Sequence, residues 1–70
     1  MEKPTKRSIT IAGHATSISL EPSFWAALSD MAAAHNMSLA DKIAEIDARP
    51  RNSSLTSALR VTVLKWERGT

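Results

Sequence analysis

Apolar and polar residues alternate near the N-terminus, which predicts extended chain. Over residues 8–12, Ile9 and Ile11 fall on one side of a strand and Ser8 and Thr10 fall on the other. Residues 15–20 repeat this alternation. Their apolar side carries Thr16, Ile18 and Leu20, and their small side carries Ala15, Ser17 and Ser19. The two stretches therefore form either a hairpin or two parts of one long, bent strand.

The residues between these stretches suit a tight turn. Gly13 followed by His14 fits the centre of a type II′ hairpin turn, because glycine readily adopts positive φ. If the stretches instead form one strand, a chain with only helices after it offers that strand no pairing partner. It can then pair only with a second copy, antiparallel about a two-fold axis.

The apolar period changes to that of a helix after Pro22, a residue suited to a first helical turn. The stripe consists of Phe24, Leu28, Met31 and His35, widened by Trp25 and Ala32. Asn36 tolerates the left-handed conformation at a helix C-terminus. We therefore expect a helix that begins at Pro22 and ends near Asn36.

Two further helices are expected. Ser38 can cap the second, whose stripe is Leu39, Ile43 and Ile46 and which Pro50 closes. Ser53 or Ser54 can cap a third, whose apolar face holds Leu55, Leu59, Thr62, Val63 and Trp66. The β-branched run RVTVL could instead form a strand, but the stripe continues across the whole segment and favours a helix.

The size of the chain suggests that it needs a partner. The chain has 70 residues, no cysteine and 43% hydrophobic residues. Chains this short bury little core alone, and disulfides are excluded here. Only His14 and His35 could offer ring nitrogens to a metal, so we expect neither a metal nor a cofactor. Oligomerisation is the remaining route, which predicts an obligate dimer.

Charge is distributed unevenly along the chain. The net charge is +2 for residues 1–20, −4 for residues 21–48 and +4 for residues 49–70. Basic ends suggest a polyanionic partner, and a solvated surface with chance clustering is the alternative. We expect no enzyme, because the sequence offers no phosphate-binding glycine loop, no thiol nucleophile and little room for a substrate cavity. A polar N-terminus and the lack of a membrane-length apolar run suggest a cytoplasmic protein.

These motifs resemble a known family. The stretch TSISLEPSFWAALSDMAAAHNMSLADKIAEID resembles a ribbon-helix-helix domain of the Arc/MetJ superfamily. More narrowly, the chain over about residues 6–68 is similar to a short prokaryotic ribbon-helix-helix family of predicted DNA-binding proteins, through the segments RSITIAGHATSISLEPSFW, SLADKIAEID and LTSALRVTVL. The resemblance implies a mostly α fold with a short β-ribbon, an intertwined homodimer and an extra C-terminal helix. We then expect three parts: a flexible basic arm (1–7), a ribbon-helix-helix domain (8–49), and a loop with a C-terminal helix packed on that domain (50–70).

The resemblance also implies roles for individual residues. Ala15, Ser17 and Ser19 would face DNA bases. Ser38 and the N–H groups of Leu39 and Ala40 would hold a DNA phosphate, with Lys3, Lys6 and Arg7 adding phosphate contacts. The dimer core would comprise Ile18, Leu20, Phe24, Trp25, Leu28, Ile43 and Ile46. Two positions depart from the family: Ala15 stands where arginine is usual, and Asn36 where glycine is common.

The expected function is DNA binding by a transcriptional repressor or similar regulator, through a dimeric ribbon in the major groove. Because Ala15 cannot read guanine as arginine does, affinity would depend mainly on phosphate contacts. The alternative is a dimeric interaction module, antitoxin-like or replicon-associated, whose C-terminal helix binds a protein partner. The expected partners are therefore double-stranded DNA, a second copy of the chain and, in the alternative, another protein.

Overall fold

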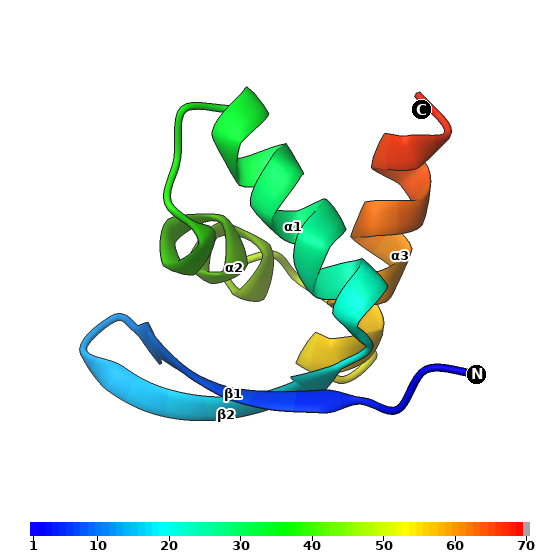
Figure 1. Cartoon of the computed structure of the whole chain (residues 1–70). Coiled ribbons are helices and arrows are strands. Elements are labelled where there is room, and N and C mark those ends of the chain that lie inside the picture. Colours follow the sequence, from blue (N-terminus) through cyan, green and yellow to red (C-terminus); the bar gives the residue numbers. More distant parts are fainter. Residues whose placement is uncertain (70) are drawn as a thin grey trace.

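A computed structural model describes residues 1–69 of the chain. Two strands precede three helices: β1 (Thr5–Ile11), β2 (His14–Leu20), α1 (Pro22–Ala34), α2 (Leu39–Asp47) and α3 (Leu55–Glu67). The strands form one layer and the helices lie together on one side of it (Figure 1). This architecture confirms the expected mostly α fold with a short β-ribbon. No helix within residues 1–69 is long and apolar enough to cross a membrane.

The ribbon is a hairpin within one chain. β1 and β2 pair antiparallel, in a register that runs from Thr5 opposite Leu20 to Ile11 opposite His14. The interpretation as one bent strand, paired only with a second copy, is therefore wrong. The turn residues are Ala12 and Gly13, with φ of 51° and 83°. Two positive φ values define a type I′ turn, whose twist matches that of the paired strands. The predicted type II′ turn at Gly13 and His14 is thus displaced by one residue, and His14 begins β2.

The N-terminal arm is shorter than expected. β1 begins at Thr5, so Thr5, Lys6 and Arg7 belong to the ribbon instead of a flexible segment. Each has a pairing partner because β2 extends to Leu20. The backbone carbonyl of Thr5 also accepts a hydrogen bond of 2.9 Å from Nε1 of Trp25. Even Glu2 is held, because its carboxylate accepts a 2.9 Å hydrogen bond from the hydroxyl of Ser23.

The end of α1 follows the prediction. Asn36 has a φ of 57°, and its N–H donates to the carbonyl of Ala33. The N–H of Met37 donates to the carbonyl of Ala32 at 2.8 Å. These two bonds form a Schellman motif, in which the left-handed residue lets the chain reverse and satisfy the last carbonyls of the helix.

The other two helices begin at serine caps. The hydroxyl of Ser38 accepts from the N–H of Asp41 at 3.0 Å, and that of Ser54 accepts from the N–H of Ser57 at 3.2 Å. The prediction of Ser38 as a cap is confirmed, and Ser54 is the cap of α3. The segment containing RVTVL is helical throughout, so the favoured interpretation of that segment is also confirmed.

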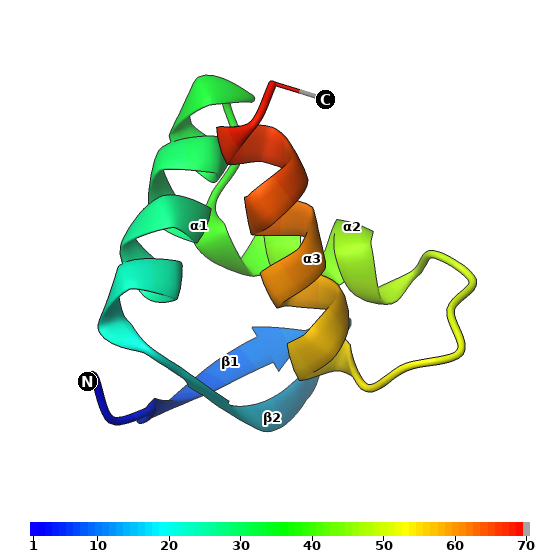
Figure 2. The same ribbon diagram turned by 90° about the vertical axis from the view of Figure 1, so that its right-hand side faces the viewer.

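The core draws on every element. α3 lies across α1 and α2, and the hairpin closes the far end (Figure 2). The buried apolar residues are Ile11, Ile18, Leu20, Trp25, Leu28, Met31, Ala32, Ile43, Ile46, Leu59 and Val63. Six of the seven residues expected in the dimer core are in this set, and Phe24 is half-buried. The single chain therefore buries them without a second copy, because β1 and α3 cover them.

Candidate nucleic-acid interface

One face of the hairpin carries small and polar side chains. Residues directly opposite each other in an antiparallel pair lie on the same face. Ala15, Ser17 and Ser19 alternate with the buried Ile18 and Leu20, so they point away from the helices. All three are exposed. We call this set, together with its partners on β1, the outer face of the ribbon.

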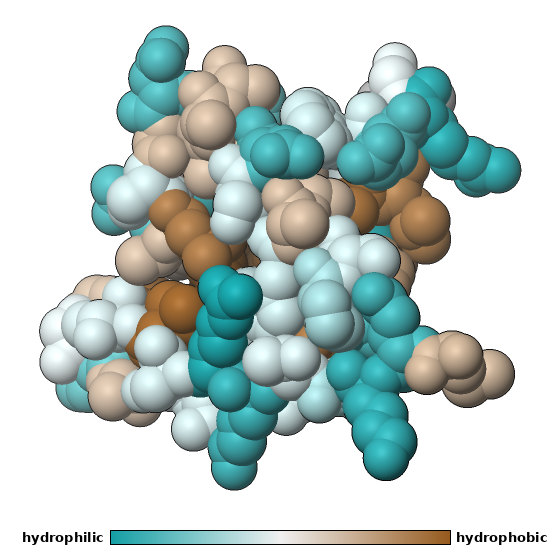
Figure 3. Space-filling model, viewed as in Figure 1, coloured by the Kyte–Doolittle hydropathy of each residue, from teal (hydrophilic) through white to brown (hydrophobic). Residues whose placement is uncertain are grey.

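The register adds three residues that the sequence alone did not place on this face. Lys6 lies opposite Ser19, Ser8 opposite Ser17, and Thr10 opposite Ala15. All of these β1 residues are exposed. The lower margin of Figure 3, where the hairpin lies, carries strongly hydrophilic side chains. Sequence reasoning could have placed Ser8 and Thr10 on this face by assuming a hairpin, since a two-residue turn fixes every cross-strand pair of residues.

The two basic residues of β1 lie on opposite faces. Lys6 is on the outer face, whereas Arg7 pairs with the buried Ile18 and so points toward the helices. The guanidinium of Arg7 lies 4.9 Å from the ring centroid of Trp25, in a cation–π contact. Arg7 therefore has a packing role that Lys6 lacks. Lys3 is exposed in the segment before β1.

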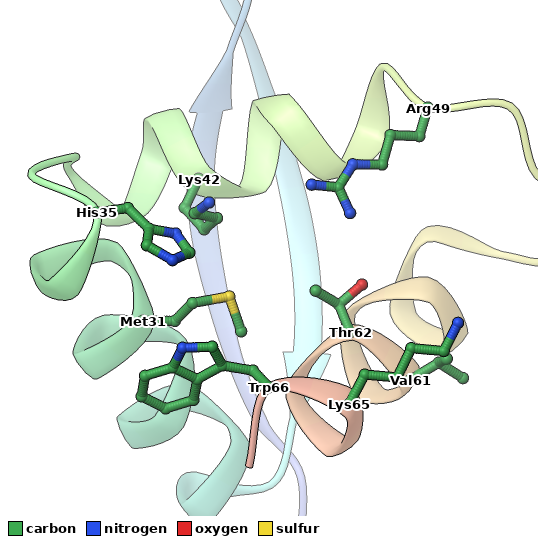
Figure 4. Close-up of a pocket in the computed structure, with 8 residues that line it drawn as sticks. All are labelled: Met31, His35, Lys42, Arg49, Val61, Thr62, Lys65 and Trp66. Atoms are coloured by element: carbon green, nitrogen blue, oxygen red, sulfur yellow. The ribbon is translucent and has the colours of Figure 1, made fainter. Parts of the chain in front are cut away.

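A second set of donors lies at the N-terminus of α2. The N–H groups of Leu39 and Ala40, in the first turn, have no acceptor earlier in the helix. With Ser38 they form the type of site that binds phosphate oxygens, aided by the helix dipole. Asp41 supplies an opposing negative charge in the same turn. α2 crosses the inner side of the ribbon, and its N-terminal end lies beyond one side of the strands (Figure 4).

The acidic middle of the chain neutralises much of the basic C-terminal part. The guanidinium of Arg60 donates to both oxygens of Glu21 at 3.0 Å. A backbone hydrogen bond at Glu21 and then this guanidinium hold the pKa of the Glu21 carboxyl below its ordinary value. Arg51 pairs with Asp47 at 3.0 Å.

Glu45 belongs to the same pattern of pairing. Its carboxylate accepts from Lys42 at 2.8 Å and from Arg49 at 3.1 Å. The hydrogen bond from Lys42 is the main cause of the lowered pKa of Glu45. Arg49, Arg51 and Arg60 are therefore each paired with a carboxylate of this chain. On the outer face of the ribbon the basic residue is Lys6.

Comparison with known proteins agrees with this geometry. A family model described as a ribbon-helix-helix domain matches residues 4–67. A search of curated proteins finds no significant match. An uncharacterized protein from Bordetella pertussis Tohama I has a similar structure, with a TM-score of 0.80 and 32% identity over 96% of this chain. The present chain spans 58% of the length of that chain. The family match covers nearly the whole molecule and includes the ribbon, α1, α2 and α3. The chain belongs to the ribbon-helix-helix domain family, a family of DNA-binding regulators in general.

Proposed function

We propose that the chain is a transcriptional regulator, most simply a repressor, that places the outer face of its ribbon in the major groove of DNA. The observation that carries the proposal is the exposed polar face that both strands share. A two-stranded ribbon fits the width of this groove. The hydroxyls of Ser8, Ser17 and Ser19 can donate to or accept from base edges, and Lys6 can reach an acceptor on guanine or a phosphate.

Sequence discrimination by this face is modest. Ala15 offers a methyl group that can contact thymine but cannot form the paired hydrogen bonds that arginine makes to guanine. Affinity then depends mainly on phosphate contacts, from Lys3 and Lys6 and from Ser38 with the N–H of Leu39. Such contacts release counterions, so binding weakens steeply as salt rises.

The open edge of β2 is the surface for a second copy. In a two-residue hairpin the pair beside the turn is hydrogen-bonded, and bonded and unbonded pairs alternate from there. The backbone groups of Ala15, Ser17 and Ser19 therefore point away from β1. Pairing of two β2 edges about a two-fold axis satisfies these groups and places two sets of outer-face side chains side by side.

A DNA titration tests the proposal. Fluorescence anisotropy with duplexes selected from a random pool, at two salt concentrations, should show binding that is tight at low salt and weaker at high salt. The Ser17→Ala/Ser19→Ala variant should discriminate less between selected and random duplexes. A matched variant, Ser29→Ala/Ser53→Ala, removes two exposed hydroxyls outside the ribbon and should keep the discrimination of the parent chain. Absence of binding at low salt would sink the proposal.

A second candidate function rests on α3. Val61 and Leu64 are 49% and 54% exposed on that helix, which suits contact with a protein partner. The buried Leu59 and Val63 lie on the same helix, so deleting it would also damage the core. Val61→Ser/Leu64→Ser is the cleaner change: it should abolish partner binding and retain DNA binding. Retention of the partner by this variant would argue against the candidate.

A further inference from the structure

A hollow of about 260 Å³ lies between the C-terminal half of α1 and the helices α2 and α3. Met31 and Trp66 supply an apolar side, and His35, Lys42, Arg49 and Lys65 supply nitrogen-bearing groups. In Figure 4 the Lys42 side chain lies on α2 beside the ring of His35, and the Arg49 guanidinium extends from just after α2 toward the space above Thr62. The outer face of the ribbon contributes no residue to this hollow.

Lys42 is the feature that distinguishes the hollow from ordinary surface. Its side chain is only 4% exposed, although it carries an ammonium group. Burial of a charge is costly unless the charge is paired. Its ammonium donates to Glu45, and the same carboxylate oxygen also accepts from Arg49. One carboxylate thus serves two cations, so these three side chains together carry one net positive charge.

We propose that this hollow binds a small organic anion, made of one phosphate or carboxylate group joined to an aromatic body. The anionic group lies between Lys42 and Arg49, where it neutralises the charge that Glu45 leaves. The aromatic body packs against Trp66 and Met31, since indole faces and thioethers both favour aromatic contacts. The site is separate from the DNA-contacting groups and does not depend on the proposed function.

Phenyl phosphate is a suitable probe because it combines both parts. Calorimetric titration of the full chain at low salt should show that it binds at least about tenfold more tightly than inorganic phosphate or phenol, each of which lacks one part. Benzoate, titrated in parallel, tells whether the site prefers a carboxylate to a phosphate. Equal affinity for phenyl phosphate and inorganic phosphate would overturn the proposal, because the aromatic body would then contribute nothing.

Two arginines provide a matched comparison. Arg49 lines the hollow, whereas Arg51 does not, and each pairs with a carboxylate four residues earlier. Arg49→Gln should weaken the binding of phenyl phosphate about tenfold, and Arg51→Gln should leave it unchanged. Since the Arg49 side chain is 55% exposed, its replacement preserves the fold. Equal weakening by both variants indicates a general charge effect and refutes the site.

The α2 N-terminus needs its own control, because it could also bind the phosphate group. Ser38→Ala should leave phenyl phosphate affinity unchanged if the probe occupies the hollow. Trp66→Phe should abolish the tryptophan fluorescence change on binding while calorimetry still detects the probe, since Trp25 lies in the core. Loss of binding in Ser38→Ala with retention in Arg49→Gln would place the probe at the helix end and overturn the proposal.

Discussion

Single residues join distant parts of this chain. Glu21 caps the entry to α1 through its backbone carbonyl, which accepts from the N–H groups of Phe24 and Trp25. Its carboxylate binds Arg60 on α3 in a two-pronged ion pair, and the Arg60 guanidinium also lies 5.9 Å from the ring centroid of Phe24. One carboxylate therefore fixes α3 against the start of α1.

Glu21 should make stability depend on pH at the acid end, first through a backbone hydrogen bond to its carboxylate and then through the ion pair with Arg60. The pKa of Glu21 in the folded chain lies below its ordinary value of 4.5. Its stabilisation is therefore complete above pH 4.5 and is lost as the pH falls through the lowered pKa. Glu21→Gln should be less stable than the parent chain at pH 7, and the difference should vanish in acid. Urea unfolding across this range measures it, and a difference that is constant with pH would contradict the assignment.

Lys6 and Arg7 are neighbours in sequence with separate roles. Lys6→Gln should weaken DNA binding and reduce the salt slope by about one, as expected for one lost phosphate contact. Arg7→Gln should instead lower the free energy of unfolding by about 0.5–1 kcal/mol, through loss of its contact with Trp25. Anisotropy titrations and urea unfolding of both variants distinguish the roles. A larger change of salt slope in Arg7→Gln would reverse the assignment.

At the scale of elements, the hairpin turn is the point of local strain. Ala12 occupies the left-handed region with a φ of 51°, which costs a residue with a Cβ roughly 1–2 kcal/mol. Asparagine is better tolerated there and forms the common Asn-Gly type I′ pair with Gly13.

Ala12→Asn should therefore stabilise the chain by about 0.5–1 kcal/mol, because it relieves strain without changing a core contact. Thermal unfolding followed by circular dichroism measures the gain. Ala33→Asn is a useful control, since it makes the same replacement at an exposed α1 position and should destabilise the helix. No gain at Ala12 would mean that the strand ends, and not the turn residues, determine hairpin stability.

The elements also show what sequence can and cannot predict. The three helices, the Ser38 cap and the left-handed Asn36 were all predictable, because they depend on local spacing and backbone preference. The predicted turn was misplaced by one residue. A turn at Gly13-His14 and a turn at Ala12-Gly13 both keep the apolar residues of the two strands on the same face, so the alternation of apolar and polar residues does not distinguish them. The Glu21–Arg60 pair joins residues 39 positions apart, and no local pattern indicates it.

At the scale of the whole molecule, the main change concerns the core. The sequence suggested that Leu28, Ile43 and Ile46 need a second copy for burial, as expected for a chain of this size. In the structure these side chains are 0–2% exposed within one chain. α3 provides the missing cover through Leu59 and Val63, and β1 provides it through Ile11. Closure of the core therefore does not require a second copy, and in the proposed dimer that copy would serve only the ribbon edge and the DNA contacts.

This arrangement predicts a folded monomer on dilution. An obligate dimer loses stability as its concentration falls, because folding and association are then one equilibrium. Here the midpoint of thermal unfolding should remain nearly constant as the protein is diluted below the concentration at which sedimentation shows that the dimer dissociates. Leu59→Ala should lower stability by about 2–5 kcal/mol at every concentration, since it opens a cavity inside one chain. If helical signal instead disappears together with the dimer, the core described here closes only in the assembled state.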